Sequence, residues 1–127
     1  MNGVEFLADT NAMIYLLAGN DCMRPYLSKK LGVSFISELE LFSFSELTEG
    51  EEVNIRNLLK ECTVFPLDSD IKEEVISLRK KYRIKLPDAI IAATAIEKGL
   101  RLLTADKGFE KIEELQLEAL SPTTISV

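Results

Sequence analysis

The sequence predicts an α/β fold built around a mostly parallel sheet flanked by helices. Short β-branched, aromatic or leucine-rich runs alternate along the chain with longer segments of helical pattern, which is the order typical of such a sheet. The 127 residues fit one compact domain. No linker, internal repeat or low-complexity tract divides them, so we expect a single domain over residues 1–127.

Five short apolar runs are predicted as strands. Each is bounded by glycine, proline or polar residues, as strands usually are. Pro66 in the third run favours a strand end or a sheet edge there. In chain order, the predicted strands span residues 4–8, 33–36, 63–67, 100–104 and 115–120.

The segments between these runs are predicted as helices. Thr48 and Glu51 have the capping-box spacing at the start of one helix. Pro87 suits the first turn of another helix, which Gly99 ends. The remaining helices are expected over 12–18, over 23–31 with Gly32 ending it, over 38–44 with Ser37 as N-cap, and from Ser69 or Asp70 to Tyr82.

Charge and residue types limit the possible chemistry. A net charge of −6 is not typical of a protein that binds nucleic acid. A metal site built from carboxylates adds negative charge locally, however, so the distribution of charge is more informative than the net charge. The absence of histidine excludes histidine-dependent nucleophiles and metal sites. Cys22 and Cys62 form no metal-ligand pattern and are expected as reduced thiols. Without a targeting or membrane segment, we expect a cytoplasmic protein.

Two aspartates stand at matching places in the predicted fold. Asp9 and Asp106 each lie where an apolar strand ends, after the first and the fourth run. Ligands of a parallel sheet bind beyond the carboxyl ends of its strands, so the two side chains are expected to converge. A helix N-cap explains either aspartate alone, whereas the pair together indicates a site.

Further carboxylates are available near this edge of the sheet. Asp88 lies in the first turn of an otherwise apolar helix, where the dipole favours an anion and where burial makes an unpaired charge costly. Glu38 and Glu40 follow the second strand, but residues two apart point to different faces of a helix, so at most one faces the site. Carboxylates without histidine favour Mg²⁺ or Mn²⁺, which would activate a water for attack on phosphorus.

Four short segments, in this order and spacing, resemble the PIN domain and, within it, the VapC-type toxins of toxin–antitoxin pairs. The resemblance extends from Phe6 to about Phe109. Its carriers are Leu7–Asn11, Ile36–Leu41, Leu86–Ala95 and Leu103–Phe109.

The resemblance implies a fold, an activity and partners. The fold is a three-layer sandwich whose five-stranded parallel sheet has the order 3-2-1-4-5, which sets the first and fourth strands side by side. The activity is metal-dependent hydrolysis of RNA phosphodiesters. The partners are a second copy in a homodimer and an antitoxin protein that blocks the site.

The resemblance also implies roles for individual residues. Asp9, Glu40 rather than Glu38, Asp88 and Asp106 are implied as catalytic metal ligands. Gly108 replaces a second aspartate that the family usually carries in the last motif. Thr10, Asn11 and Thr104 are implied as supports that hydrogen-bond the ligands or water.

Basic residues next to the predicted site are candidates for RNA contacts. A solvated helix end, where Lys and Arg complement the dipole, is an equally good explanation of them. The candidates are Arg79, Lys81, Arg83, Lys85 and Lys107, with Lys80 and Lys111 nearby.

Two other functions compete with a ribonuclease. The glycine at 108 suggests a catalytically weakened PIN-like module that binds RNA or a protein partner. A phospho-acceptor receiver domain would also use an acidic pocket in an α/β fold, but no acidic pair stands beside Asp9.

Overall fold

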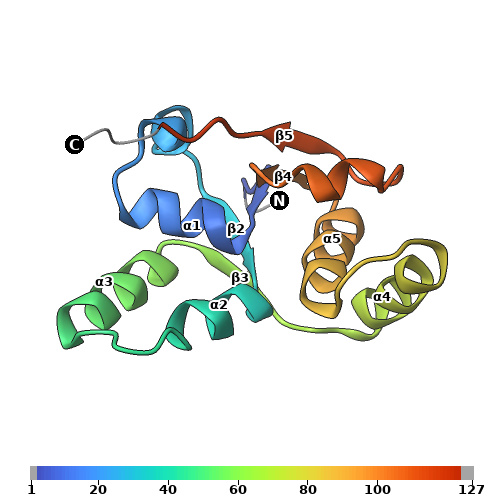
Figure 1. The fold of residues 1–127 in the computed structure, drawn as a ribbon, viewed down its shortest axis with the longest axis horizontal. Coiled ribbons are helices and arrows are strands. Elements are labelled where there is room, and N and C mark those ends of the chain that lie inside the picture. Colours follow the sequence, from blue (N-terminus) through green and yellow to red (C-terminus); the bar gives the residue numbers. More distant parts are fainter. Residues whose placement is uncertain (1–2, 124–127) are drawn as a thin grey trace.

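The computed structural model describes residues 3–123, in which one five-stranded sheet carries helices on both faces (Figure 1). All neighbouring strands run parallel, in the order β3-β2-β1-β4-β5. This confirms the predicted fold class and sheet order. Receiver domains have the order 2-1-3-4-5, so the receiver alternative is wrong. Residues 1–2 and 124–127 of the expected domain lie outside the described residues.

Strands and helices alternate as predicted, but four of the strands are shorter than the apolar runs suggested. The strands are β1 (Phe6–Ala8), β2 (Leu31–Ser34), β3 (Thr63–Phe65), β4 (Arg101–Thr104) and β5 (Leu117–Ala119). The α-helices are α1 (Thr10–Leu17), α2 (Phe35–Phe42), α3 (Glu49–Lys60), α4 (Ser69–Lys81) and α5 (Leu86–Lys98), and the short 3-10 helices are η1 (Asp21–Tyr26) and η2 (Lys107–Lys111).

The core lies in two parts, one on each face of the sheet. Side chains alternate between the faces along a strand, so Leu7 packs with α4 and α5, whereas Phe6 and Ala8 pack with α1, α2 and α3. Figure 1 shows these two helical groups on opposite sides of the strands. Within the described part of the chain, every helix is too short or too polar to cross a membrane.

The helix predicted over 23–31 is wrong. Only Asp21–Tyr26 is helical there, as the 3-10 helix η1, and Leu31 already belongs to β2. Gly32 does not end a helix. It lies buried in β2, where a Cβ atom would come within 2.6 Å of Phe65 Cε2 and 3.3 Å of Val4 Cγ1. Glycine at this position allows the side chain of a neighbouring strand to pack closely over the backbone.

Replacing Gly32 with valine is therefore expected to destabilise the fold by about 1–3 kcal/mol, the usual cost of overpacking a core. Urea unfolding measures the change. Gly50→Ala is the matched control, because a Cβ atom at Gly50 in α3 meets nothing closer than Thr48 Oγ1 at 3.9 Å. That variant should be at least as stable as wild type, since alanine fits the helical backbone of the first turn of α3 and restricts the unfolded chain more than glycine does. A Gly32→Val protein as stable as wild type would contradict this account of β2.

Several helix boundaries depend on caps. The capping box of Thr48 and Glu51 is confirmed, as is the αL conformation of Gly99 after α5. Two predicted caps are wrong, because Ser34 rather than Ser37 caps α2, and Asp68 caps α4. α2 therefore begins three residues earlier than predicted, and it buries Ser37 and Leu41.

Candidate active site

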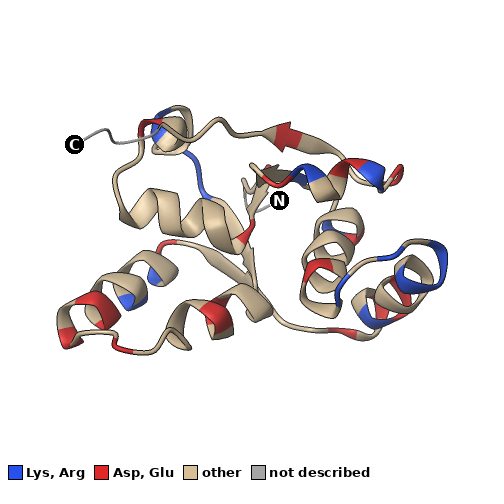
Figure 2. Cartoon of the chain, in the orientation of Figure 1, with Lys and Arg blue, Asp and Glu red and all other residues tan. Residues whose placement is uncertain are grey.

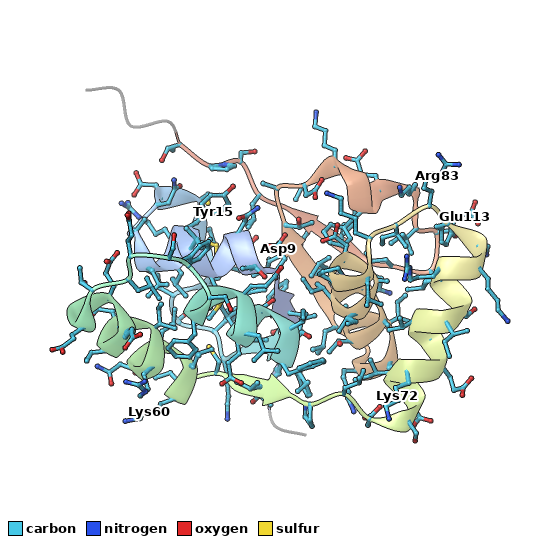
Figure 3. All side chains as sticks on the ribbon, turned by 60° about the horizontal axis from the view of Figure 1, so that its bottom comes forward. Asp9, Tyr15, Lys60, Lys72, Arg83 and Glu113 are labelled. Carbon is cyan, nitrogen blue, oxygen red and sulfur yellow. The ribbon has the colours of Figure 1, made fainter. Side chains whose placement is uncertain are left out.

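Asp9 is both a helix cap and the buried centre of the candidate site. It directly follows β1, and its Oδ1 accepts a 2.8 Å hydrogen bond from the backbone N–H of Ala12 in α1. Only 4% of the residue is exposed. Figure 3 shows Asp9 in the middle of the molecule, between the two helical layers. The same side chain therefore caps α1 and lies in the candidate site, so the cap that the sequence offered as an alternative explanation does not exclude a role in the site.

Thr104 joins the ends of β1 and β4. Its hydroxyl donates a 2.5 Å hydrogen bond to Asp9 Oδ2 and accepts a 3.0 Å bond from the backbone N–H of Asp106. Asp106 is exposed and caps η2 by accepting from the N–H of Gly108 at 2.8 Å. The predicted convergence of the two aspartates follows from this shared threonine and from the adjacency of β1 and β4.

The structure separates the two glutamates of α2. Glu40 Oε1 accepts a 2.5 Å hydrogen bond from the Thr10 hydroxyl, which also lies 2.9 Å from the Ser37 hydroxyl. Glu38 instead lines a different pocket with Phe42 and Arg56. The glutamate chosen by resemblance is thus the one that lies beside the aspartates.

The four predicted acids line one pocket of about 250 Å³, which we call the acidic pocket. Thr10 and Asn11 line it as well, whereas Thr104 does not line it but donates a hydrogen bond to Asp9. The apolar walls of this pocket and the buried Ser37 were not predicted from the sequence, although Ser37 lies one helical turn before Glu40. The residues lining the acidic pocket are Asp9, Thr10, Asn11, Ile14, Glu40, Phe44, Asp88, Asp106 and Phe109.

Burial and mutual repulsion shape the electrostatics of the acidic pocket. Burial raises the pKa of the Asp9 carboxyl, hydrogen bonds from Thr104 and Ala12 act in the opposite direction, and the charges of Asp106 and Asp88 raise it further. Burial also raises the pKa of Asp88, with added repulsion from Asp106 and Glu40. A cation placed among these carboxylates would offset both effects.

The donor set fits a hard divalent cation. Carboxylate oxygens are the ligands that Mg²⁺ and Mn²⁺ prefer, and the described residues contain no histidine to favour zinc. Within residues 3–123, no three acidic or cysteine side chains already lie close enough to ligate one ion together. Mg²⁺ in proteins is commonly held by one or two carboxylates and several waters, so this arrangement fits a partly hydrated ion.

Replacing Thr104 with valine is expected to lower stability by about 1–3 kcal/mol in EDTA at neutral pH, because the buried Asp9 carboxylate loses a donor. That bond lowers the pKa of Asp9, so its loss raises this pKa further. At pH values above the pKa of Asp9 in the folded protein, the ionised carboxylate therefore destabilises the variant more than it destabilises wild type. This difference in stability disappears at pH values low enough to protonate Asp9 in both folded proteins. Urea unfolding should show a smaller loss in mild acid, and Thr104→Ser should resemble wild type. An equal loss at both pH values would exclude Asp9 as the group affected.

The predicted basic residues divide into two groups. Arg79, Arg83 and Lys85 line a second pocket of about 410 Å³ together with Lys111, and we call it the basic pocket. Lys81 lies outside it and pairs with Glu114 at 3.1 Å. Lys107 lines neither this pocket nor the acidic one, and lies with Glu110 and Leu117 on the other side of Asp106.

The model of the PIN domain family matches residues 6–115, so the chain belongs to the PIN-domain family. A chain of a toxin–antitoxin complex from Klebsiella pneumoniae is 30% identical with a TM-score of 0.75, and the match covers 87% of this chain and 95% of that one. A chain of VapBC-1 from nontypeable Haemophilus influenzae is 25% identical with a TM-score of 0.75, covering 91% and 97% of the two chains.

A third solved structure is similar in fold. A chain of VapBC2 from Rickettsia felis, bound to a DNA fragment from its promoter, has a TM-score of 0.82 at 21% identity and covers 93% of this chain and 99% of that one. A search among curated proteins found no match. The resemblance seen in the sequence is thereby confirmed for the PIN domain and for likeness to VapBC proteins.

Proposed function

We propose that the chain is a Mg²⁺- or Mn²⁺-dependent endoribonuclease, the toxin of a toxin–antitoxin pair, formed by residues 1–127 as one domain. The observation that carries this proposal is the acidic pocket, in which four carboxylates from separate segments of a PIN domain converge at the carboxyl ends of β1 and β4. Phosphodiester hydrolysis is the chemistry that a hard cation in such a pocket supports.

Asp9, Glu40, Asp88 and Asp106 would hold the cation, which supplies charge stabilisation and a more acidic bound water. The chain's own groups position these ligands. Thr104 fixes Asp9 from behind, and the pair of hydroxyls on Thr10 and Ser37 fixes Glu40. Asn11 is exposed in the acidic pocket, where its amide is placed to hydrogen-bond water or substrate.

We also propose an antitoxin partner and a homodimer for this chain, acting in the cytoplasm. The likeness to chains of toxin–antitoxin complexes supports the first partner. Exposed apolar side chains beside the site support a protein partner as well, since Leu17 and Phe44 are 37% and 49% exposed. Sedimentation of the purified chain, alone and with the product of the neighbouring gene, would measure both associations.

The test of the proposed function is cleavage of a mixed pool of structured RNA by the purified chain, with Mn²⁺ or Mg²⁺ and with EDTA. We expect cutting only with the metal. Cutting that is equally fast in EDTA would contradict the proposal.

A weakened binding module remains the second candidate, because Gly108 supplies only its backbone N–H to Asp106 where the family usually carries another acid. It predicts that folded protein binds the RNA pool but never cuts it, at any metal concentration. The same assay therefore separates the two functions.

A further inference from the structure

The basic pocket lies directly beside the acidic pocket. Its walls come from the end of α4, the connection to α5, the start of α5 and η2. The two pockets share Asp88, Asp106 and Phe109, so a ligand can extend from one into the other. Figure 2 shows Lys and Arg gathered over the end of α4 and the segment that follows it.

The cations of the basic pocket form no close ion pairs, although Asp88 and Asp106 line the same pocket and Lys85 and Lys111 act on Asp88 through their charge. Within residues 3–123, none of its four basic side chains lies within 4.0 Å of an acidic group, whereas Lys81 nearby pairs with Glu114. Basic side chains therefore outnumber the two lining carboxylates in this pocket, on a chain whose net charge is −6. The four residues concerned are Arg79, Arg83, Lys85 and Lys111.

Hydrogen bonds between its walls hold the basic pocket in shape. Lys111 Nζ donates to the backbone carbonyl of Arg83, which fastens η2 to the α4–α5 connection. The Tyr82 hydroxyl donates to Glu114 Oε1 at 2.6 Å and accepts from the backbone N–H of Glu113 at 3.1 Å. A pocket formed in advance loses less conformational freedom when it binds an anion.

We infer that the basic pocket binds a backbone phosphate of RNA, next to the phosphodiester that lies in the acidic pocket. This inference rests on the proposed function and locates the substrate strand across Asp88 and Asp106. Arginine side chains match the geometry of phosphate oxygens. RNA is favoured over an acidic protein segment because a strand with one bond in the acidic pocket necessarily carries another phosphate one nucleotide away.

The first test measures binding without cleavage. Asp9→Asn protein is titrated with a fluorescent, mixed-sequence 2′-O-methyl oligoribonucleotide over a range of salt concentrations. Adding Arg79→Gln and Arg83→Gln should weaken binding and reduce the slope of log K against log salt by about 0.7 for each phosphate that the protein no longer neutralises. The matched control adds Lys72→Gln and Lys80→Gln, which remove the same charge from α4 outside both pockets and should leave the slope unchanged.

The second test uses cleavable strands in which one phosphate at a time is replaced by a neutral methylphosphonate. Neutralising the phosphate beside the cleaved bond should lower kcat/KM for wild type and not for the Arg79→Gln/Arg83→Gln protein. Cleavage by wild type that is indifferent to every such replacement would overturn the inference.

The binding test keeps the inference separate from the proposed function, because it needs no turnover. If the protein never cuts RNA, but only the arginine variants lose salt-dependent binding, the proposed nuclease activity would be wrong and phosphate binding in the basic pocket would be supported. If the slope of log K against log salt is the same in the arginine and lysine variants and wild type still cuts RNA, the inference that the basic pocket binds phosphate would be wrong, whereas the proposed function would stand.

Discussion

Replacing Asp9 with asparagine is expected to lower the rate of RNA cleavage by about 10³-fold or more, while the chain stays folded. A catalytic metal contributes several kcal/mol of charge stabilisation in the transition state, and about 1.4 kcal/mol corresponds to a factor of ten in rate. Asp9 is the most buried of the four acids and lies at the end of the central strand. Loss of its charge should therefore remove the metal and the activity together.

The fold should survive this change. Asparagine is as good an N-cap as aspartate, so its oxygen can still accept from the N–H of Ala12. Burial and the charges of Asp106 and Asp88 raise the pKa of Asp9, which means that the ionised carboxylate is unfavourable in the metal-free protein. The melting temperature in EDTA should consequently equal or exceed that of wild type.

Asp68→Asn is the matched control. Asp68 also caps a helix, accepting from the N–H of Ile71 at 2.8 Å, but it lies at the start of α4 and pairs with Lys98. We expect this variant to cut RNA at the wild-type rate. Equal reductions in Asp9→Asn and Asp68→Asn would mean that a disturbed cap, rather than a missing metal ligand, explains the effect.

Glu40→Gln is expected to reduce cleavage by about 10²-fold, because one charge is removed from the set that would bind the metal. Glutamine keeps an oxygen that can accept from Thr10, so the position of α2 should not change. Mn²⁺ should also stabilise this variant against heat less than it stabilises wild type. The measurement combines initial cleavage rates with melting temperatures at increasing Mn²⁺.

Glu38→Gln makes the same chemical change two residues away on the same helix. Because Glu38 lines a separate pocket with Phe42 and Arg56, we expect an unchanged cleavage rate and an unchanged response to Mn²⁺. If Glu38→Gln loses activity and Glu40→Gln does not, the second acid has been assigned to the wrong residue.

The sequence was sufficient for features that depend on local pattern. The alternation of strands and helices predicted the fold class, and the two aspartates at strand ends predicted that β1 and β4 meet at the site. The capping box at Thr48 and the stop at Gly99 follow from backbone rules that hold in most contexts. The two helix caps need only a few neighbouring residues, whereas the meeting of the aspartates follows from the general rule that ligands bind at the carboxyl ends of parallel strands.

Features that depend on packing could not be predicted from the residues alone. The choice between Glu38 and Glu40 depends on which face of α2 packs against α1, where Thr10 bonds to Glu40. Gly32 has the pattern of a helix stop, and its place in β2 follows from the close packing of the Phe65 and Val4 side chains over its backbone. The separation of Lys81 from the basic pocket likewise depends on its long-range pairing with Glu114.

The central claim is that the acidic pocket holds the divalent cation with which the chain cuts RNA. The most direct measurement is a Mn²⁺ titration of wild type and Asp9→Asn, followed both by calorimetric binding and by the cleavage rate. We predict that wild type binds Mn²⁺ over the same concentration range in which cleavage rises, and that Asp9→Asn loses both. Binding that is unchanged in Asp9→Asn, or cleavage at full rate before any Mn²⁺ is bound, would contradict the claim.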